Sequence, residues 1–102
     1  MWFTEVRPFA QGAAKLSVAF QDESTLNLTI GNIWFEVYGN VRKNLPYLRT
    51  IVAAVIAGRV EEAGSEMSAF GRIHTSEGVV RVGAMHLPWR WRQFRQYLPY
   101  SQ

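Results

Sequence analysis

The feature that most constrains this chain is a change in its hydrophobic period near residue 44. Before that point, apolar and polar residues alternate in three short segments, residues 16–20, 26–30 and 33–38. A two-residue period is typical of half-buried strands, and the connections at 21–24 and Gly31-Asn32 are short enough for hairpins. The sequence therefore predicts a three-stranded antiparallel meander, preceded by a short strand over residues 2–6.

Beyond residue 44 the apolar residues recur at spacings of three and four, which is the period of an amphipathic helix. Asn44 can cap this helix, Pro46 is tolerated in its first turn, and Gly64 supplies a stop. We therefore expect one long helix from about Leu45 to Glu62, with Glu61 and Glu62 on its solvated end.

The remaining segments predict a second hairpin and a second helix. Residues 68–74 and 79–85 resemble two strands around a turn at 75–78, and Trp91, Phe94, Tyr97 and Leu98 then fall on one stripe of a short C-terminal helix that Pro99 ends. The predicted order is (β)βββαββα. This is an α+β, two-layer fold, in which a central helix covers one face of an antiparallel sheet of about five strands.

Length and composition favour one folded domain over residues 1–102. The hydrophobic fraction is 48% and the charged fraction 19%, as in ordinary globular proteins, and there is no repeat or linker. No cysteine is present, so disulfides and thiolate metal sites are excluded. The first residues lack a basic region followed by an apolar run, and we expect a cytoplasmic protein that does not enter a membrane.

The charge of +3 is concentrated at one end of the chain. Residues 1–85 carry eight basic and eight acidic side chains, so the whole excess comes from Arg90, Arg92 and Arg95. These three arginines form a candidate basic patch. They alternate with aromatic residues, and Trp89 and Trp91 are candidate protein-binding residues.

This aromatic and arginine segment has several interpretations. It can be an amphipathic helix docked by its rings, with the arginines solvated or paired with Glu61, Glu62 or Glu66. It can bind an acidic protein. It can also bind nucleic acid, because rings stack on bases while arginines neutralise phosphates.

A second candidate binding surface lies on the strand at 33–38. Trp34, Glu36 and Tyr38 share one face of this strand, whereas its other face is apolar. A sheet can bury only one face against a single helix. The remaining face is either covered by the C-terminal segment or presents its aromatic residues to a partner, as Trp and Tyr do at binding hot spots.

The sequence offers no set of residues suited to catalysis. His74 and His86 are the only imidazoles, too few for a metal site without further ligands, and no nucleophile elbow or glycine-rich phosphate loop occurs. We predict no catalytic residue, no metal and no cofactor, and hence a protein that is not an enzyme.

The function favoured by these features is that of a small non-enzymatic binding protein of bacterial or phage type. An immunity protein or another inhibitor that occludes a macromolecular target fits the size of the chain and its surplus of aromatic residues. The alternatives are a nucleic-acid-binding protein that uses the C-terminal Trp/Arg segment, and a homodimeric scaffold or small-ligand-binding domain.

Overall fold

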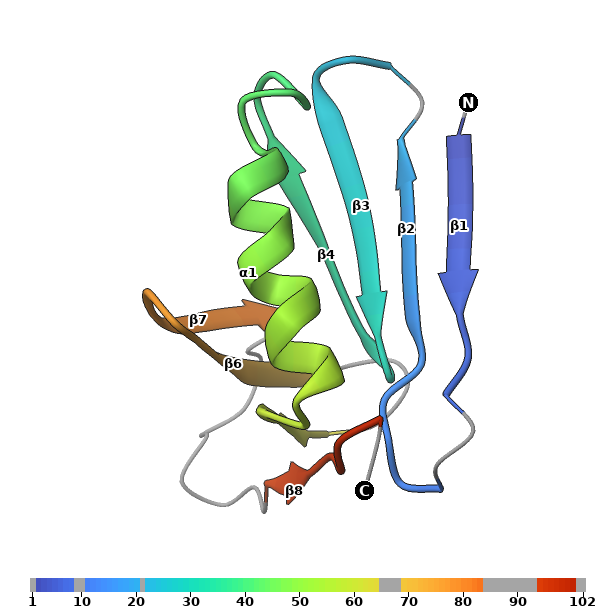
Figure 1. Cartoon of the computed structure of the whole chain (residues 1–102), viewed down its shortest axis with the longest axis vertical. Helices are drawn as coiled ribbons and strands as arrows, with labels where there is room; N and C mark the ends of the chain where they lie inside the picture. Colours follow the sequence, from blue (N-terminus) through green and yellow to red (C-terminus); the bar gives the residue numbers. More distant parts are fainter. Residues whose placement is uncertain (1, 9–10, 21, 65–68, 84–93, 101–102) are drawn as a thin grey trace.

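Two antiparallel sheets and one helix make up the described part of the protein (Figure 1). The computed structural model describes residues 2–8, 11–20, 22–64, 69–83 and 94–100. Sheet 1 has the strand order β1-β2-β3-β4 and sheet 2 the order β7-β6-β5-β8. In chain order the elements are β1 (Trp2–Val6), β2 (Leu16–Phe20), β3 (Thr25–Ile30), β4 (Ile33–Tyr38), α1 (Leu45–Ile56), β5 (Val60–Ala63), β6 (Phe70–Thr75), β7 (Gly78–Gly83) and β8 (Arg95–Gln96).

The α+β class is confirmed, but the predicted layout is wrong. One sheet of about five strands was expected, and the structure has two sheets of four strands each. The difference arises in the segment after the helix, where residues expected to be helical form strand β5. Because β5 pairs with β6 on one side and β8 on the other, the second hairpin belongs to a sheet of its own.

The predicted meander is the part of sheet 1 built by β2, β3 and β4. Cross-strand rows such as Val18, Leu28 and Phe35 place their side chains on the buried face. β1 extends this sheet by pairing with β2 in a continuous register from Trp2↔Phe20 to Val6↔Leu16. Short hairpin connections thus produce the antiparallel order that the alternating pattern predicts.

The helix begins at the predicted residue and ends six residues before its predicted end. It starts at Leu45, directly after Asn44, whose side-chain amide donates to the Tyr38 carbonyl at 3.2 Å and forms no cap. It ends at Ile56 because Gly58 adopts a φ of +74°, a left-handed conformation that turns the chain out of the helix. A Cβ at Gly58 would lie 2.5 Å from the backbone nitrogen of Pro99, so this turn also requires glycine for space.

The core lies between the helix and the two sheets. Figure 1 shows α1 in front of β4 and of the strands β6 and β7, with β1 at the edge of sheet 1 farthest from the helix. Ile51 and Val55 of α1 are fully buried, together with Ile33 of β4 and Ile73 of β6. The sheets approach closely at Gly71, where a Cβ would lie 2.3 Å from the Cδ1 atom of Ile33.

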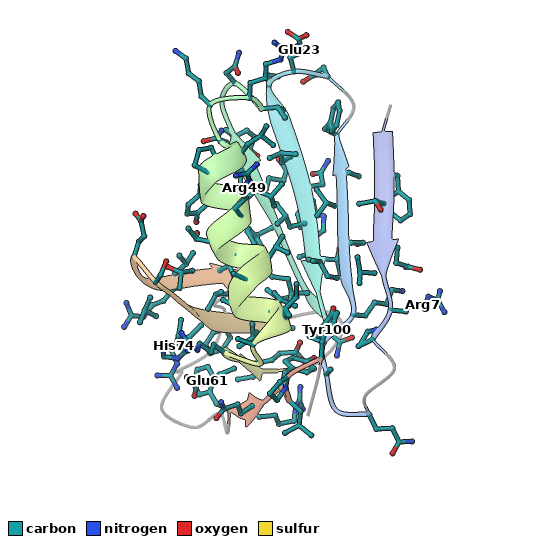
Figure 2. All side chains as sticks on the ribbon, in the orientation of Figure 1. Arg7, Glu23, Arg49, Glu61, His74 and Tyr100 are labelled. Carbon is teal, nitrogen blue, oxygen red and sulfur yellow. The ribbon has the colours of Figure 1, made fainter. Side chains whose placement is uncertain are left out.

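The predicted C-terminal helix is wrong over residues 94–100, which we call the C-terminal segment. It is extended, and its backbone N–H groups bond to other parts of the chain: Tyr97 to the Val60 carbonyl (2.9 Å), Leu98 to Gly12 (2.8 Å) and Tyr100 to Ile56 (2.9 Å). Trp91, the first residue of the expected helical stripe, lies outside the described residues. The segment therefore connects β5, the β1–β2 connection and the end of α1 (Figure 2 labels Tyr100 at this point).

No helix in the described ranges has the length and apolar character needed to cross a bilayer.

Candidate functional site

The face of sheet 1 turned away from α1, which we call the outer face, exposes large aromatic side chains. Trp34 is 56% exposed and Tyr38 is 73% exposed, both on β4. The strand register places Glu36 in one row with Asn27, Ala19 and Phe3. Phe3 is itself 60% exposed, so aromatic residues stand on both edge strands of the same face.

The two middle strands carry only small side chains on this face. They are Ser17 and Ala19 on β2 and Thr25, Asn27 and Thr29 on β3, all partly buried. Three strand spacings separate β1 from β4, a width of about 14 Å. We call the strip of small residues on the outer face the trough, with Phe3 of β1 as one rim and Trp34 and Tyr38 of β4 as the other.

A carboxylate lies between the two rings of the β4 rim. The hydroxyl of Tyr38 donates a hydrogen bond to Glu36, and this bond, with the nearby negative charge, raises the pKa of Tyr38 above its ordinary value of 10.0. On the opposite rim, Glu5 forms ion pairs with Arg7 (2.7 Å) and Lys15 (2.8 Å). The trough thus combines exposed rings with one carboxylate that has no ion pair among the described residues.

The predicted residues Trp34, Glu36 and Tyr38 therefore do share one face, and residues 94–100 do not cover it, whereas residues 84–93 of the expected covering segment lie outside the described residues. That segment bonds to Gly12, Ile56 and Val60, away from the outer face. Phe3 was not singled out from the sequence. Its position across the sheet from Trp34 and Tyr38 depends on the pairing of β1 with β2, which no pattern in the sequence specifies.

A second constellation, which we call the junction, surrounds the buried carboxylate of Glu62 where the sheets meet. Glu62 has 0% exposure and accepts four hydrogen bonds. The donors are the backbone N–H of Asn32 (2.9 Å), its side-chain amide (3.2 Å), the Arg95 guanidinium (2.8 Å) and the Tyr97 hydroxyl (2.8 Å). These contacts join the β3–β4 turn of sheet 1 to β5 and the C-terminal segment.

Burial is the main cause of a strongly raised pKa at Tyr97, and its hydrogen bond to Glu62 raises that pKa further. Gly31, at the same turn, has no room for a side chain, because a Cβ there would lie 2.0 Å from the Tyr97 hydroxyl. The backbone N–H and side-chain amide of Asn32, the Arg95 guanidinium and the Tyr97 hydroxyl each donate to Glu62. The arrangement suits a structural connection between the two sheets.

The candidate basic patch is only partly placed. Arg95 is paired with Glu62, one of the three carboxylates considered for it, and also donates to the Gly64 carbonyl at 3.2 Å. Its charge is therefore compensated inside the fold. Trp89, Arg90, Trp91 and Arg92 lie outside the described residues, as does His86.

The face of sheet 2 turned away from the core carries a charged cluster. Glu61 bonds to the Nε2 atom of His74 and to the Arg72 guanidinium at 3.1 Å (Figure 2 shows Glu61 and His74 side by side). The hydrogen bond from His74, followed by the charge of Arg72, holds the pKa of Glu61 below its ordinary value of 4.5. Arg72 also lies 3.8 Å above the ring of Phe94, a cation–π contact.

Two more arginines extend this face. Arg81 is opposite Arg72 in the register of β6 and β7, and Arg59 precedes β5 with its carbonyl bonded to the His74 N–H. Both are exposed, and neither forms an ion pair within the described residues. Sheet 2 therefore presents more positive than negative charge on this side.

Among the described residues, depressions open to solvent also occur on the surface. One of about 470 Å³ lies between the start of α1 and the β6–β7 turn, lined among others by Lys43, Tyr47 and Glu77. Another of about 440 Å³ lies over the junction. Across residues 2–8, 11–20, 22–64, 69–83 and 94–100, no three His, Asp or Glu side chains gather as a metal site would require.

Comparison of the chain with protein-family models, with curated proteins and with solved structures finds no match. The function must therefore be argued from the geometry of these surfaces.

Proposed function

We propose that this chain is a small, non-enzymatic binding protein that recognises another protein through the outer face of sheet 1. The observation that carries the proposal is the exposure of Phe3, Trp34 and Tyr38 on one face of a hydrogen-bonded sheet. Large rings held at fixed positions give much contact area at little cost in conformational entropy. The core does not use these rings, so their surface is free for a partner.

The shape and charge of the trough define the chemistry of the partner. An α-helix with its side chains is about 10–12 Å across, comparable with the about 14 Å between the backbones of β1 and β4. An apolar stripe on that helix would contact the rings. A lysine or arginine beside the stripe would pair with Glu36, which would otherwise lose water without gaining a compensating charge.

An inhibitor or immunity protein that covers a functional surface of its target is the biological form we favour. Blocking a target requires a stable face of the right shape and no reaction chemistry. The chain supplies such a face on sheet 1, and a bacterial or phage origin and a cytoplasmic location remain part of this proposal.

The test begins by capturing a partner with the intact chain, identifying it, and measuring its affinity for the purified chain by calorimetry. Trp34→Ala and Tyr38→Ala should each weaken binding at least about 30-fold, because rings at the centre of an interface contribute about 2 kcal/mol or more. Glu36→Gln should weaken it less and reduce its dependence on salt.

Tyr47→Ala is the matched control, since it removes the same kind of ring from a different surface. It should leave the affinity unchanged. Equal binding by wild type, Trp34→Ala and Tyr38→Ala would overturn the proposal, provided that circular dichroism shows the same fold in all three.

Nucleic-acid binding is the second candidate, and the charges on sheet 2 favour it. Arg59, Arg72 and Arg81 lie on one side of that sheet, and within the part of the chain that the structure describes Glu61 is the one carboxylate among them. Binding to single-stranded probes should then fall steeply as salt is raised, and Arg59→Gln with Arg81→Gln should flatten that dependence. Arg49→Gln, an exposed arginine on α1, is the control. A probe that does not shift at low salt would dismiss this candidate.

A further inference from the structure

The two sheets have four edge strands, and β1 lacks the protection that the other three possess. β8 has only two residues. β7 has an exposed arginine, Arg81, at its centre and a glycine at each end. β4 packs against β7 and β6 of the other sheet. Short length, central charge and coverage are the devices by which proteins prevent strands from pairing with other chains.

β1 runs for five residues with no proline, no lysine and no interruption of its register with β2. Both of its faces expose apolar side chains, Phe3 on the outer face (60%) and Val6 on the inner one (43%). Its one charged residue, Glu5, is already neutralised by Arg7 and Lys15. In the described structure no strand pairs with its open side.

The hydrogen-bond pattern identifies which backbone groups face that open side. The Gly31 N–H donates to the Lys15 carbonyl at 2.9 Å, so the odd-numbered residues of β2 bond to β3. The backbone N–H and C=O groups of successive residues point to opposite sides of a strand. Leu16, Val18 and Phe20 therefore bond to β1. Their partners are Val6, Thr4 and Trp2, which leaves the N–H and C=O groups of Phe3 and Glu5 directed outward.

We propose that β1 pairs antiparallel with β1 of a second copy of this chain, about a two-fold axis that passes through Thr4. In this register Phe3 of each copy lies opposite Glu5 of the other. Both residues direct their N–H and C=O groups outward, so the two pairs form four hydrogen bonds and satisfy all of these groups. The product is one continuous eight-stranded sheet.

Neighbouring registers fit less well. A two-fold axis through Glu5 places two carboxylates directly opposite one another, which is unfavourable. An axis through Phe3 leaves Val6 without a partner. The axis through Thr4 pairs all five residues, with Trp2 opposite Val6 and no like charges directly opposed.

Two sheets joined in this way place their outer faces side by side. Each copy keeps its own trough, because the β4 rims lie at the two distant edges of the joined sheet. A five-residue strand buries little area, so we expect a reversible dimer with a dissociation constant on the order of micromolar to millimolar. The dimer does not depend on any partner of the outer face.

Sedimentation equilibrium of the untagged chain, from about 10 μM to about 1 mM, tests this proposal in the concentration range expected for a weak interface. Wild type should follow a monomer–dimer equilibrium. Glu5→Pro should weaken association at least about tenfold, because proline deletes an outward N–H and edge strands tolerate it at such positions. Glu5→Ala removes the same carboxylate but keeps the N–H, so it should associate like wild type.

Hydrogen exchange gives a readout that needs no variant. The amides of Phe3 and Glu5 should become protected as concentration rises, whereas that of Thr4 should be protected throughout by its bond to β2. A chain that stays monomeric at the highest concentration would overturn the proposal, as would Glu5→Pro with undiminished association. A dimer lost in Tyr38→Ala but kept in Glu5→Pro would place the interface on the outer face instead.

Discussion

Glu62 and Glu36 are both carboxylates within strands beside tyrosine, yet the protein surrounds them in opposite ways. At the junction, four donors enclose Glu62 and leave it without exposure. On the outer face, Glu36 accepts a hydrogen bond from the Tyr38 hydroxyl, and the rings of Trp34 and Tyr38 are exposed to solvent. Groups that satisfy one another hold a fold together, whereas groups left free can be used by a partner. This contrast predicts where mutations should change stability and where they should change binding.

The largest effect should come from removing the carboxylate of the junction. Glu62→Ala leaves Arg95, Tyr97 and Asn32 without their acceptor, and each part-buried donor left unsatisfied costs about 1–3 kcal/mol of unfolding free energy. Glu36→Ala is the matched change on the outer face and should cost about 1 kcal/mol or less. Urea denaturation measures both, and similar losses would remove the distinction between the two regions.

The next largest difference in stability should come from adding a methyl group between the two sheets or on the outer face. Gly71→Ala puts a methyl group 2.3 Å from Ile33 and 2.6 Å from the Glu61 carbonyl, so overpacking should cost about 1–3 kcal/mol. Ser17→Thr adds a methyl group to the floor of the trough and should change stability by about 0.5 kcal/mol or less. Thermal unfolding of the pair tests this, and a tolerated Gly71→Ala would mean that the sheets are packed less tightly than described.

Glu61 should give a smaller, pH-dependent effect. Its pKa is lower in the folded protein than the ordinary 4.5, so its ionised form adds stability above that pH and the contribution is lost as pH falls through the lowered value. Glu61→Gln should therefore flatten the fall in unfolding free energy on the acid side of pH 4.5. Urea titrations at several pH values measure the slope, and an unchanged slope would contradict the role of His74 and Arg72.

The smallest effect on stability should follow changes to the β4 rim. Tyr38→Thr keeps a residue suited to strands and removes a ring that is 73% exposed, so the free energy of unfolding should change by about 0.5 kcal/mol or less. Chemical denaturation is the measurement. A large loss would show that Tyr38 supports the fold and would weaken its assignment to a binding surface.

The sequence predicted the elements that local pattern controls. Apolar and polar residues alternate in residues 16–20, 26–30 and 33–38, and the structure places β2, β3 and β4 there. The second hairpin also lies where the turn at 75–78 predicts it, as β6 and β7. In these segments, the side-chain period and the turn residues both favour the observed pairing.

The sequence failed where distant contacts decide the structure. Glu61 and Glu62 resemble a solvated helix end, and only the donors at Asn32, Arg95 and Tyr97 explain a buried Glu62 in a strand. The stripe containing Phe94, Tyr97 and Leu98 suggests a helix, but its backbone bonds to Gly12 and Val60 instead. The hydrophobic period of a short segment does not indicate which distant residues its backbone and side chains bond to.

The same contrast applies to the candidate sites. Trp34, Glu36 and Tyr38 share a face because a strand repeats every two residues, which the sequence shows directly. Phe3 reaches the other rim through the pairing of β1 with β2, which the sequence does not specify. Glu62 is one of three carboxylates that the sequence suggested as partners of the arginines. The register of β5 and β8 places Arg95 opposite it.

The C-terminal segment has a consequence for how the protein folds during synthesis. Arg95 and Tyr97 supply two of the four donors to Glu62, and they are translated more than thirty positions after it. A ribosome-bound chain can form the early meander while this carboxylate still lacks those partners. Because contacts between distant residues form slowly, we expect the two halves of the molecule to become fixed to one another only after the last residues emerge.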